Sequence, residues 1–148
     1  MNIHFICRGN ILRSLVAETY LKSLGLKDVT VTSSGTNVNW EDEQERKYFS
    51  NTLRLLNNHD IKAHVKDLPE QLTQQRTDNN DITVCMNQRV IDEASAIVSL
   101  PENVIDWNII DIGEGHRTVE TDKELYLEEI YKEITDKVDK LVKTYDLV

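Results

Sequence analysis

The sequence of 148 residues is short of cysteine, of long hydrophobic runs and of positive charge. Its two cysteines, Cys7 and Cys85, cannot form a disulfide framework, which favours a reducing, cytoplasmic compartment. The apolar run at residues 3–6 is too short for a signal peptide or a membrane span. Lysine and arginine number 17 against 26 aspartates and glutamates, giving a net charge of −9. Neither nucleic acid nor an anionic membrane is therefore an expected partner.

What the sequence does contain is typical of one globular domain. Hydrophobic residues make up 39% and charged residues 29% of the chain. A chain of this length can bury a substantial core. No internal repeat, linker or low-complexity tract divides it. We therefore expect a single domain over residues 1–148.

Apolar or β-branched runs alternate along the chain with segments of helical periodicity. The runs predict strands at 2–6, 29–33, 81–86 and 103–105, and the periodic segments predict helices at 13–24, 41–58, 87–97 and 122–145. A short extended piece is expected near 61–65, and Pro69 suits the first turn of a further helix. This alternation indicates an α/β fold with right-handed crossovers. The prediction is a doubly wound, four-stranded parallel sheet in the order 2-1-3-4, which brings the strand ends to one edge.

The segment after the first predicted strand reads Cys7-Arg8-Gly9-Asn10-Ile11-Leu12-Arg13-Ser14 and leads into the first predicted helix. Three sources of positive potential are expected to meet there: loop amides turned inward, the helix N-terminus and the guanidinium of Arg13. Arg8 adds a second local cation in an otherwise acidic protein. Positive potential stabilises a thiolate, so we expect Cys7 to be a nucleophile beneath a tetrahedral oxyanion. The pattern favours phosphoryl transfer to Cys7; a buried structural cysteine before an ordinary strand–helix turn has the same spacing.

The other residues of this segment fit a loop that wraps one phosphate. Five residues separate Cys7 from Arg13, enough chain to bring the arginine back over the phosphate oxygens. Gly9 allows a positive φ and a close approach of the backbone. Asn10 tolerates the left-handed region, and its side chain can tie the loop together. Ser14, on the first helical turn, is placed to donate a hydrogen bond to the sulfur.

This segment resembles the Cys-x-Gly-Asn-x-Cys-Arg-Ser loop of the low-molecular-weight protein tyrosine phosphatases. Ser33-Ser34-Gly35-Thr36 is similar to the Ser-Ala-Gly-Thr after the family's second strand, and Trp40 stands where many members carry an aromatic residue at the pocket mouth. The resemblance is strong over the first forty residues and loose beyond about residue 100. It implies the phosphotyrosine phosphatase I-like fold, which is the sheet already predicted. The residues implied to bind phosphate or substrate are Arg8, Gly9, Asn10, Ile11, Leu12, Ser14 and Trp40.

The resemblance also implies a general acid. The segment at 107–113 is similar to the family's loop that ends in Asp-Pro, and the match makes Asp111 the acid that protonates the leaving group and then activates water. An anionic substrate nearby favours the protonated carboxyl, so we expect an activity optimum on the acidic side of neutral. Alternatively, Asp111 is an acidic residue of a solvated loop without a catalytic role. Asp106 is then the fallback candidate for the general acid.

Several positions depart from the family. Ile112 replaces the expected proline, and the residues that follow it lack the aromatic wall of the pocket. Leu12 replaces a second cysteine, and Cys85 is expected to be inert core rather than its substitute, so peroxide should inactivate the protein irreversibly. Ile11 occupies a position where isoleucine accompanies tyrosine-phosphatase activity and threonine marks phosphoarginine phosphatases.

We therefore expect a cysteine-dependent phosphatase that hydrolyses phosphotyrosine, on a protein or a small aryl phosphate, through a phosphocysteine intermediate. Cys7, Arg13 and Asp111 would be catalytic, and neither a metal nor a cofactor is expected because arginine and backbone amides supply the positive charge. A monomer or weak dimer is expected. Two alternatives remain: a phospho-ligand-binding regulator without turnover, and a thiol-linked arsenate reductase. The reductase is disfavoured because its chemistry passes oxidation along three cysteines, whereas this chain has two.

Overall fold

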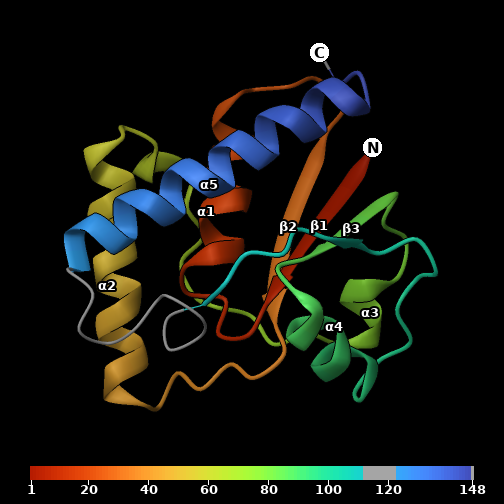
Figure 1. Ribbon diagram of the computed structural model, residues 1–148, viewed down its shortest axis with the longest axis horizontal. Coiled ribbons are helices and arrows are strands. Elements are labelled where there is room, and N and C mark those ends of the chain that lie inside the picture. Colours follow the sequence, from red (N-terminus) through yellow and green to blue (C-terminus); the bar gives the residue numbers. More distant parts are fainter. Residues whose placement is uncertain (112–122, 148) are drawn as a thin grey trace.

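The computed structural model describes residues 1–111 and 123–147 and is built on one parallel sheet (Figure 1). Its four strands are β1 (Asn2–Cys7), β2 (Thr30–Gly35), β3 (Ile82–Cys85) and β4 (Ile105–Asp106). They lie in the order β2-β1-β3-β4, and every neighbouring pair is parallel. The predicted order 2-1-3-4 is thus confirmed.

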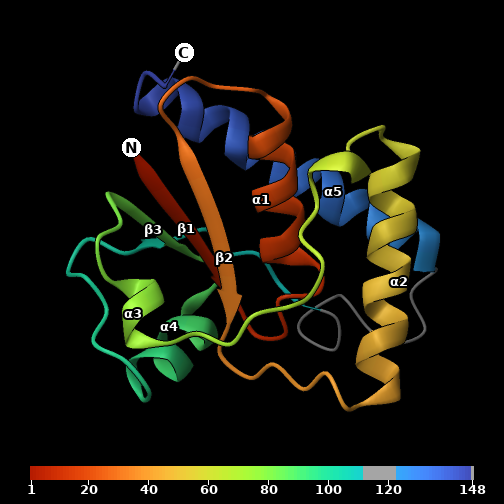
Figure 2. The ribbon, with the colours of Figure 1, turned by 180° about the vertical axis from the view of Figure 1, so that it is seen from behind.

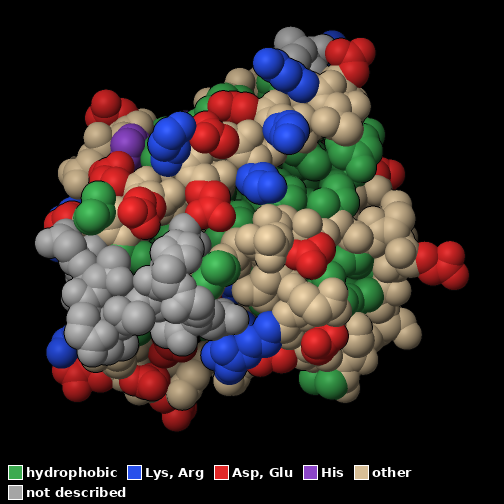
Figure 3. Space-filling model, viewed as in Figure 1, with side chains coloured by type: hydrophobic (Ala, Val, Ile, Leu, Met, Phe, Trp, Pro, Cys, Tyr) green, Lys and Arg blue, Asp and Glu red, His purple; other side chains and the backbone are tan. Residues whose placement is uncertain are grey.

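Helices cover both faces of this sheet (Figures 1 and 2). The helices are α1 (Arg13–Ser23), α2 (Glu43–Asn58), α3 (Gln74–Thr77), α4 (Gln88–Ser95) and α5 (Lys123–Thr144), with a short 3-10 helix η1 (Lys62–His64). Helices α1 and α5 pack against each other on one side of the sheet, while α3 and α4 lie on the other. Helix α2 stands beside α5, and Thr52 in it donates to the carbonyl of Ile11 in the loop that follows β1. The outer surface of α5 carries exposed charged side chains of both signs (Figure 3).

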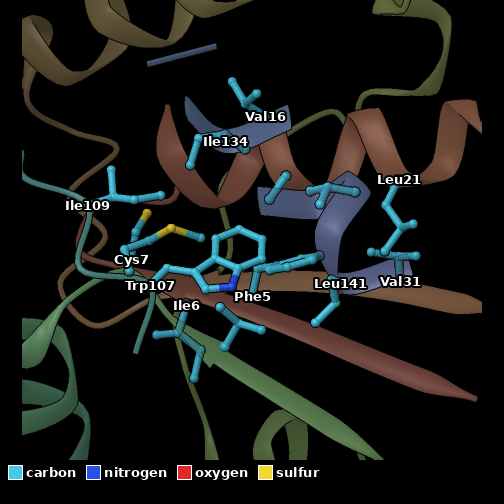
Figure 4. Packing of buried hydrophobic residues seen from close by; sticks show 14 of the residues in the cluster. Phe5, Ile6, Cys7, Val16, Leu21, Val31, Trp107, Ile109, Ile134 and Leu141 are labelled. Atoms are coloured by element: carbon cyan, nitrogen blue, oxygen red, sulfur yellow. The ribbon is translucent and has the colours of Figure 1, made fainter. Parts of the chain in front are cut away.

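The core lies between the sheet and the helices α1 and α5 (Figure 4). Phe5 of β1 is completely buried, and its ring centroid lies 5.3 Å from that of Trp107, which follows β4. Ile134 and Leu141 of α5 face this pair from the opposite layer. Full burial of a side chain such as Phe5 stabilises the fold by roughly 1.5–3 kcal/mol. The strand that carries Cys7 is therefore held firmly on its buried face.

The register of the sheet gathers the carboxyl ends of the strands. Cys7 pairs with Gly35 of β2, and Ile6 pairs with Cys85 of β3. The chain then leaves β4 towards the same edge, where the amide of Ile109 donates to the carbonyl of Met86 at 2.7 Å. In open parallel sheets this edge is where ligands bind.

Residues 61–73 differ from the sequence-based prediction. The expected extended piece near 61–65 is the helix η1, because Ile61 is buried and its amide caps the end of α2 through the carbonyl of Leu56. Pro69 lies outside any helix. The backbone that follows it bridges to Gly35, whose amide donates to the carbonyl of Glu70 at 2.9 Å. Helix α3 therefore begins only after Thr73, whose side chain caps it.

Candidate active site

Cys7 is the last residue of β1 and begins the loop that leads to α1. The residue is buried, with 2% of its surface exposed. The amide of Asn10 donates to Sγ at 3.2 Å, and the hydroxyl of Ser14 lies 2.9 Å from the same atom. Hydrogen bonds donated to a sulfur favour its anionic form. The loop geometry is thus suited to holding Cys7 as a thiolate.

Asn10 is the residue that fixes the shape of this loop. Its φ is 55°, in the left-handed region, and its side chain is fully buried. The amide nitrogen of that side chain donates to the hydroxyls of Ser14 at 2.7 Å and Ser33 at 2.9 Å, and its oxygen accepts from the amide of Glu70 at 2.9 Å. Of the two positions expected to tolerate a positive φ, Gly9 and Asn10, Asn10 adopts it, because these three hydrogen bonds hold the asparagine in that conformation.

Two backbone segments approach each other closely at Gly35. A Cβ on Gly35 would lie 2.4 Å from the carbonyl oxygen of Arg8, a distance that no side chain tolerates. The next two amides after Gly35 donate to the carbonyls of Cys7 and Arg8, each at 2.9 Å. The end of β2 therefore supports the loop from below through direct backbone contact.

Arg13 is buried, 3% exposed as a residue, and is aimed at the segment that follows β4. Its Nη1 donates to the carbonyl of Ile109 at 3.2 Å, and its Nη2 lies 3.2 Å from Oδ2 of Asp111. The side chain of Asn87 donates to the same Ile109 carbonyl at 3.0 Å. The fold thus brings Asp111 to Arg13 across 98 positions of sequence. Asp106, the fallback acid, is exposed, and its side chain caps the turn by accepting from the amide of Asn108.

Arg8 differs from Arg13 in its partner. Its Nε lies 3.0 Å from both carboxylate oxygens of Glu93 on α4, and Thr36 donates to one of these oxygens. The charge of Arg8 is therefore balanced by a carboxylate outside the loop. This reduces the positive potential that the sequence alone attributes to Arg8.

A cavity of about 440 Å³ opens above the sulfur. Its lining comes from the loop after β1, from α2, from Asp111 and from α5. The described residues that line it are Cys7, Arg8, Gly9, Ile11, Leu12, Arg13, Asn37, Gln44, Glu45, Tyr48, Asn51, Thr52, Asp111, Tyr126 and Leu127. Asn10 and Ser14 are fully buried and contact the sulfur without lining the cavity. The cavity thus contains all three residues expected to be catalytic.

Trp40 does not line this cavity in the described part of the chain. Its ring packs edge-on against Phe49, with 5.1 Å between centroids, and the aromatic side chains at the cavity are Tyr48 and Tyr126. Sequence reasoning missed the wall formed by α2. The sequence feature that corresponds to this wall is a set of polar and aromatic residues at helical spacing, from Gln44 to Thr52, on one face of an amphipathic helix. Thr52 also ties this wall to the loop by donating to the carbonyl of Ile11 at 2.5 Å.

Cys85 is fully buried in β3, and burial raises the pKa of its thiol to about 12. Its thiol is therefore protonated near neutrality, which makes it unsuited to a thiol relay. The predicted departures at 112–116 lie outside the described residues.

Within residues 1–111 and 123–147, no cluster of three His, Cys, Asp or Glu side chains is arranged to hold a metal ion. Over the same residues, no helix combines the length and apolar character needed to span a membrane.

Residues 2–146 match the model of a protein family described as "Low molecular weight phosphotyrosine protein phosphatase". The chain belongs to this family. It is accordingly a phosphatase, a hydrolase of the cysteine-based kind. Among curated proteins, none matches it.

Solved structures of the family share its fold at low identity. A low-molecular-weight phosphotyrosine phosphatase of Vibrio cholerae O395 is 18% identical with a TM-score of 0.73, covering 99% of this chain and 97% of its own. The tyrosine phosphatase AmsI of Erwinia amylovora is 19% identical with a TM-score of 0.71, covering 97% and 91%. An arginine phosphatase of Drosophila is 18% identical with a TM-score of 0.69, covering 98% of each chain. The fold therefore serves both tyrosine and arginine phosphatases.

Proposed function

We propose that this phosphatase hydrolyses phosphotyrosine, on a protein or a small aryl phosphate, through a phosphocysteine on Cys7. The observation that carries the proposal is the meeting of Cys7, Arg13 and Asp111 at one cavity, with Arg13 Nη2 only 3.2 Å from Asp111 Oδ2. A nucleophile, an oxyanion-binding guanidinium and a proton carrier are the three groups that this reaction needs.

In the first step the sulfur of Cys7 attacks phosphorus, and the bond from phosphorus to the tyrosyl oxygen breaks. Asp111 gives its proton to that oxygen, so tyrosine leaves neutral. Arg13 and the loop amides hold the equatorial phosphate oxygens and stabilise their charge in the transition state. Positive charge for this step comes from the chain itself, through the buried Arg13 and the N-terminus of α1.

In the second step a water molecule attacks the phosphocysteine and passes a proton to the Asp111 carboxylate. The bond between phosphorus and sulfur breaks, and inorganic phosphate leaves. Cys7 returns as a thiolate, which the hydroxyl of Ser14, 2.9 Å away, stabilises as the leaving group. The same carboxyl thus serves as acid and then as base.

The walls of the cavity support an aromatic substrate. Ile11 and Leu12 supply apolar surface on one side, and Tyr48 of α2 and Tyr126 of α5 supply aromatic rings. A flat ring gains from burial against such surfaces. The phosphoryl group would lie on the loop and the tyrosyl ring between these walls.

The test uses three peptides of one sequence that carry phosphotyrosine, phosphoarginine or phosphoserine. We expect phosphate release from the phosphotyrosine peptide, no release by Cys7→Ser, and retained activity in the control Cys85→Ala. Preference for the phosphoarginine peptide would contradict the proposed substrate. Binding of the phosphotyrosine peptide without any turnover by the wild type would instead identify a phospho-ligand-binding regulator.

A further inference from the structure

The cavity contains a carboxylate that the proposed reaction does not use. Glu45 lies on the third position of α2 and lines the cavity together with Asp111. One of its carboxylate oxygens lies 3.6 Å from the point where a Cβ on Gly9 would stand, so the side chain reaches the phosphate-binding loop. The residue is half-buried.

The surroundings of Glu45 differ from those of the other carboxylates near the loop. Asp111 is paired with Arg13, and Glu93 is paired with Arg8. Among the residues that the structure describes, the Glu45 carboxylate has no ion pair and no hydrogen bond from a side chain. Burial, followed by the nearby charges of Asp42 and Asp111, raises its pKa, and Arg8 opposes this only in part. A half-buried carboxylate without a counter-ion is unfavourable, and a cation placed beside it is stabilised.

Substrate binding increases this imbalance. A phosphate dianion on the loop engages Arg13, the present partner of Asp111, and adds negative charge near both carboxylates. Among the described residues of α2 that line the cavity, none carries a positive charge. A cationic group carried by the substrate itself would supply it.

We propose that Glu45 is a specificity-determining residue that selects phosphopeptides with lysine or arginine next to the phosphorylated residue. This inference rests on the proposed function and names the peptide class that the same site prefers. Glu45 and Tyr48 lie three positions apart on the face of α2 that lines the cavity, so they are neighbours on the helix surface. A tyrosyl ring packed against Tyr48 therefore brings the side chain of the adjacent peptide residue within reach of Glu45.

The experiment compares two phosphotyrosine peptides that differ only in the residues flanking the phosphotyrosine, lysine in one and glutamate in the other. For the wild type we expect kcat/KM to be about five- to tenfold higher for the lysine peptide at low salt, and the ratio to shrink as salt screens the pair. Glu45→Gln should bring the ratio close to one, and Glu45→Lys should invert it. The matched control is Glu43→Gln, which removes an exposed carboxylate of the same helix that does not line the cavity and should leave the ratio unchanged.

Equilibrium binding of the same peptides to Cys7→Ser separates this inference from the proposed function. Tighter binding of the lysine peptide, lost in Cys7→Ser/Glu45→Gln, supports charge selection even if the wild type releases no phosphate. Equal affinities for the two peptides, or a preference that survives Glu45→Gln, would overturn it. Phosphate release from both peptides at equal rates would overturn it as well while leaving the phosphatase proposal standing.

Discussion

Nη2 of Arg13 lies 3.2 Å from Oδ2 of Asp111 in a cavity that Cys7 also lines. Without substrate, the guanidinium that would bind the phosphate is thus occupied by the carboxylate that would carry the proton. In the proposed mechanism a bound phosphate would share Arg13 and place negative charge near Asp111, and both effects would favour the protonated carboxyl. The ion pair between Arg13 and Asp111 would then link phosphate binding to proton delivery.

Asp111→Asn tests this role through the leaving group. On a phosphotyrosine peptide, whose phenolate leaves poorly, we expect kcat/KM to fall by about 10²- to 10⁴-fold, because the proton donor of the first step is lost. On para-nitrophenyl phosphate the loss in the first step should be much smaller, since that leaving group needs little protonation. Asp106→Asn serves as the control, because Asp106 is exposed and caps a turn outside the cavity. Equal losses of kcat/KM on both substrates would argue against proton donation by Asp111, because kcat/KM reports only the steps up to departure of the leaving group, whereas the second step is common to both substrates.

Gly35→Ala tests the support of the loop by β2. The new Cβ would stand 2.4 Å from the carbonyl of Arg8, so the loop or the strand must move. We expect a loss of roughly 1–3 kcal/mol in the free energy of unfolding and a clear fall in kcat/KM, measured by urea unfolding and by phosphatase assay. Gly25→Ala is the comparison: its φ of 62° strains an alanine, yet no atom lies within 4 Å of the new Cβ. That variant should lose stability and keep its activity; activity retained in Gly35→Ala would show that the loop does not depend on this contact.

The lowered pKa of the buried His4 leads to a prediction about how the stability of the fold depends on pH. Burial lowers the pKa of His4 to about 4, and the ring nitrogens lie 2.6 Å from the Thr32 hydroxyl and 2.7 Å from that of Ser34. The unfolded chain binds this proton near pH 6.5 and the folded chain does not, so stability is full above that pH and declines as pH falls towards 4. Between about pH 6.5 and pH 5 the loss from this group should be about 2 kcal/mol.

Urea unfolding at several pH values measures this decline. His4→Gln should lower stability at neutral pH but flatten its dependence on pH in this window. An unchanged slope in His4→Gln would assign the decline to other groups.

The burial of Cys85 leads to a prediction about inactivation of the protein by oxidants. Its thiol is buried and its pKa is raised to about 12 by that burial, so it offers no thiolate to form a disulfide with an oxidised Cys7. We expect peroxide to inactivate the protein with little recovery in dithiothreitol, and inorganic phosphate to protect it. Full recovery, lost in Cys85→Ala, would show that the two cysteines form a disulfide.

The sequence was most informative where a local pattern determines local structure. The four-strand order followed from alternation of strands with helices, and the left-handed residue was confined to a glycine–asparagine pair. Both residues tolerate a positive φ, glycine at the lowest cost, and Asn10 is the one that adopts it, held by hydrogen bonds to Ser14, Ser33 and Glu70. Those partners come from three separate parts of the chain. Local preference alone does not identify them.

Contacts across long stretches of sequence account for the other differences. Arg8 is paired with Glu93 of α4, 85 positions away. The ring of Trp40 packs on Phe49 of α2. Glu45 and Tyr48 carry no motif and reach the cavity only through the placement of α2 beside the loop. The floor of the site follows from a motif, and its walls follow from tertiary packing.

Trapping the phosphoryl group on the enzyme tests the central claim most directly. With para-nitrophenyl phosphate, Asp111→Asn should complete the first step and then hydrolyse the intermediate slowly, because the second step needs the carboxylate as a base. Acid quenching followed by mass spectrometry of the digested protein should find the added phosphate on the peptide that contains Cys7. Turnover with no phosphate on Cys7, or undiminished turnover by Cys7→Ser, would contradict the account.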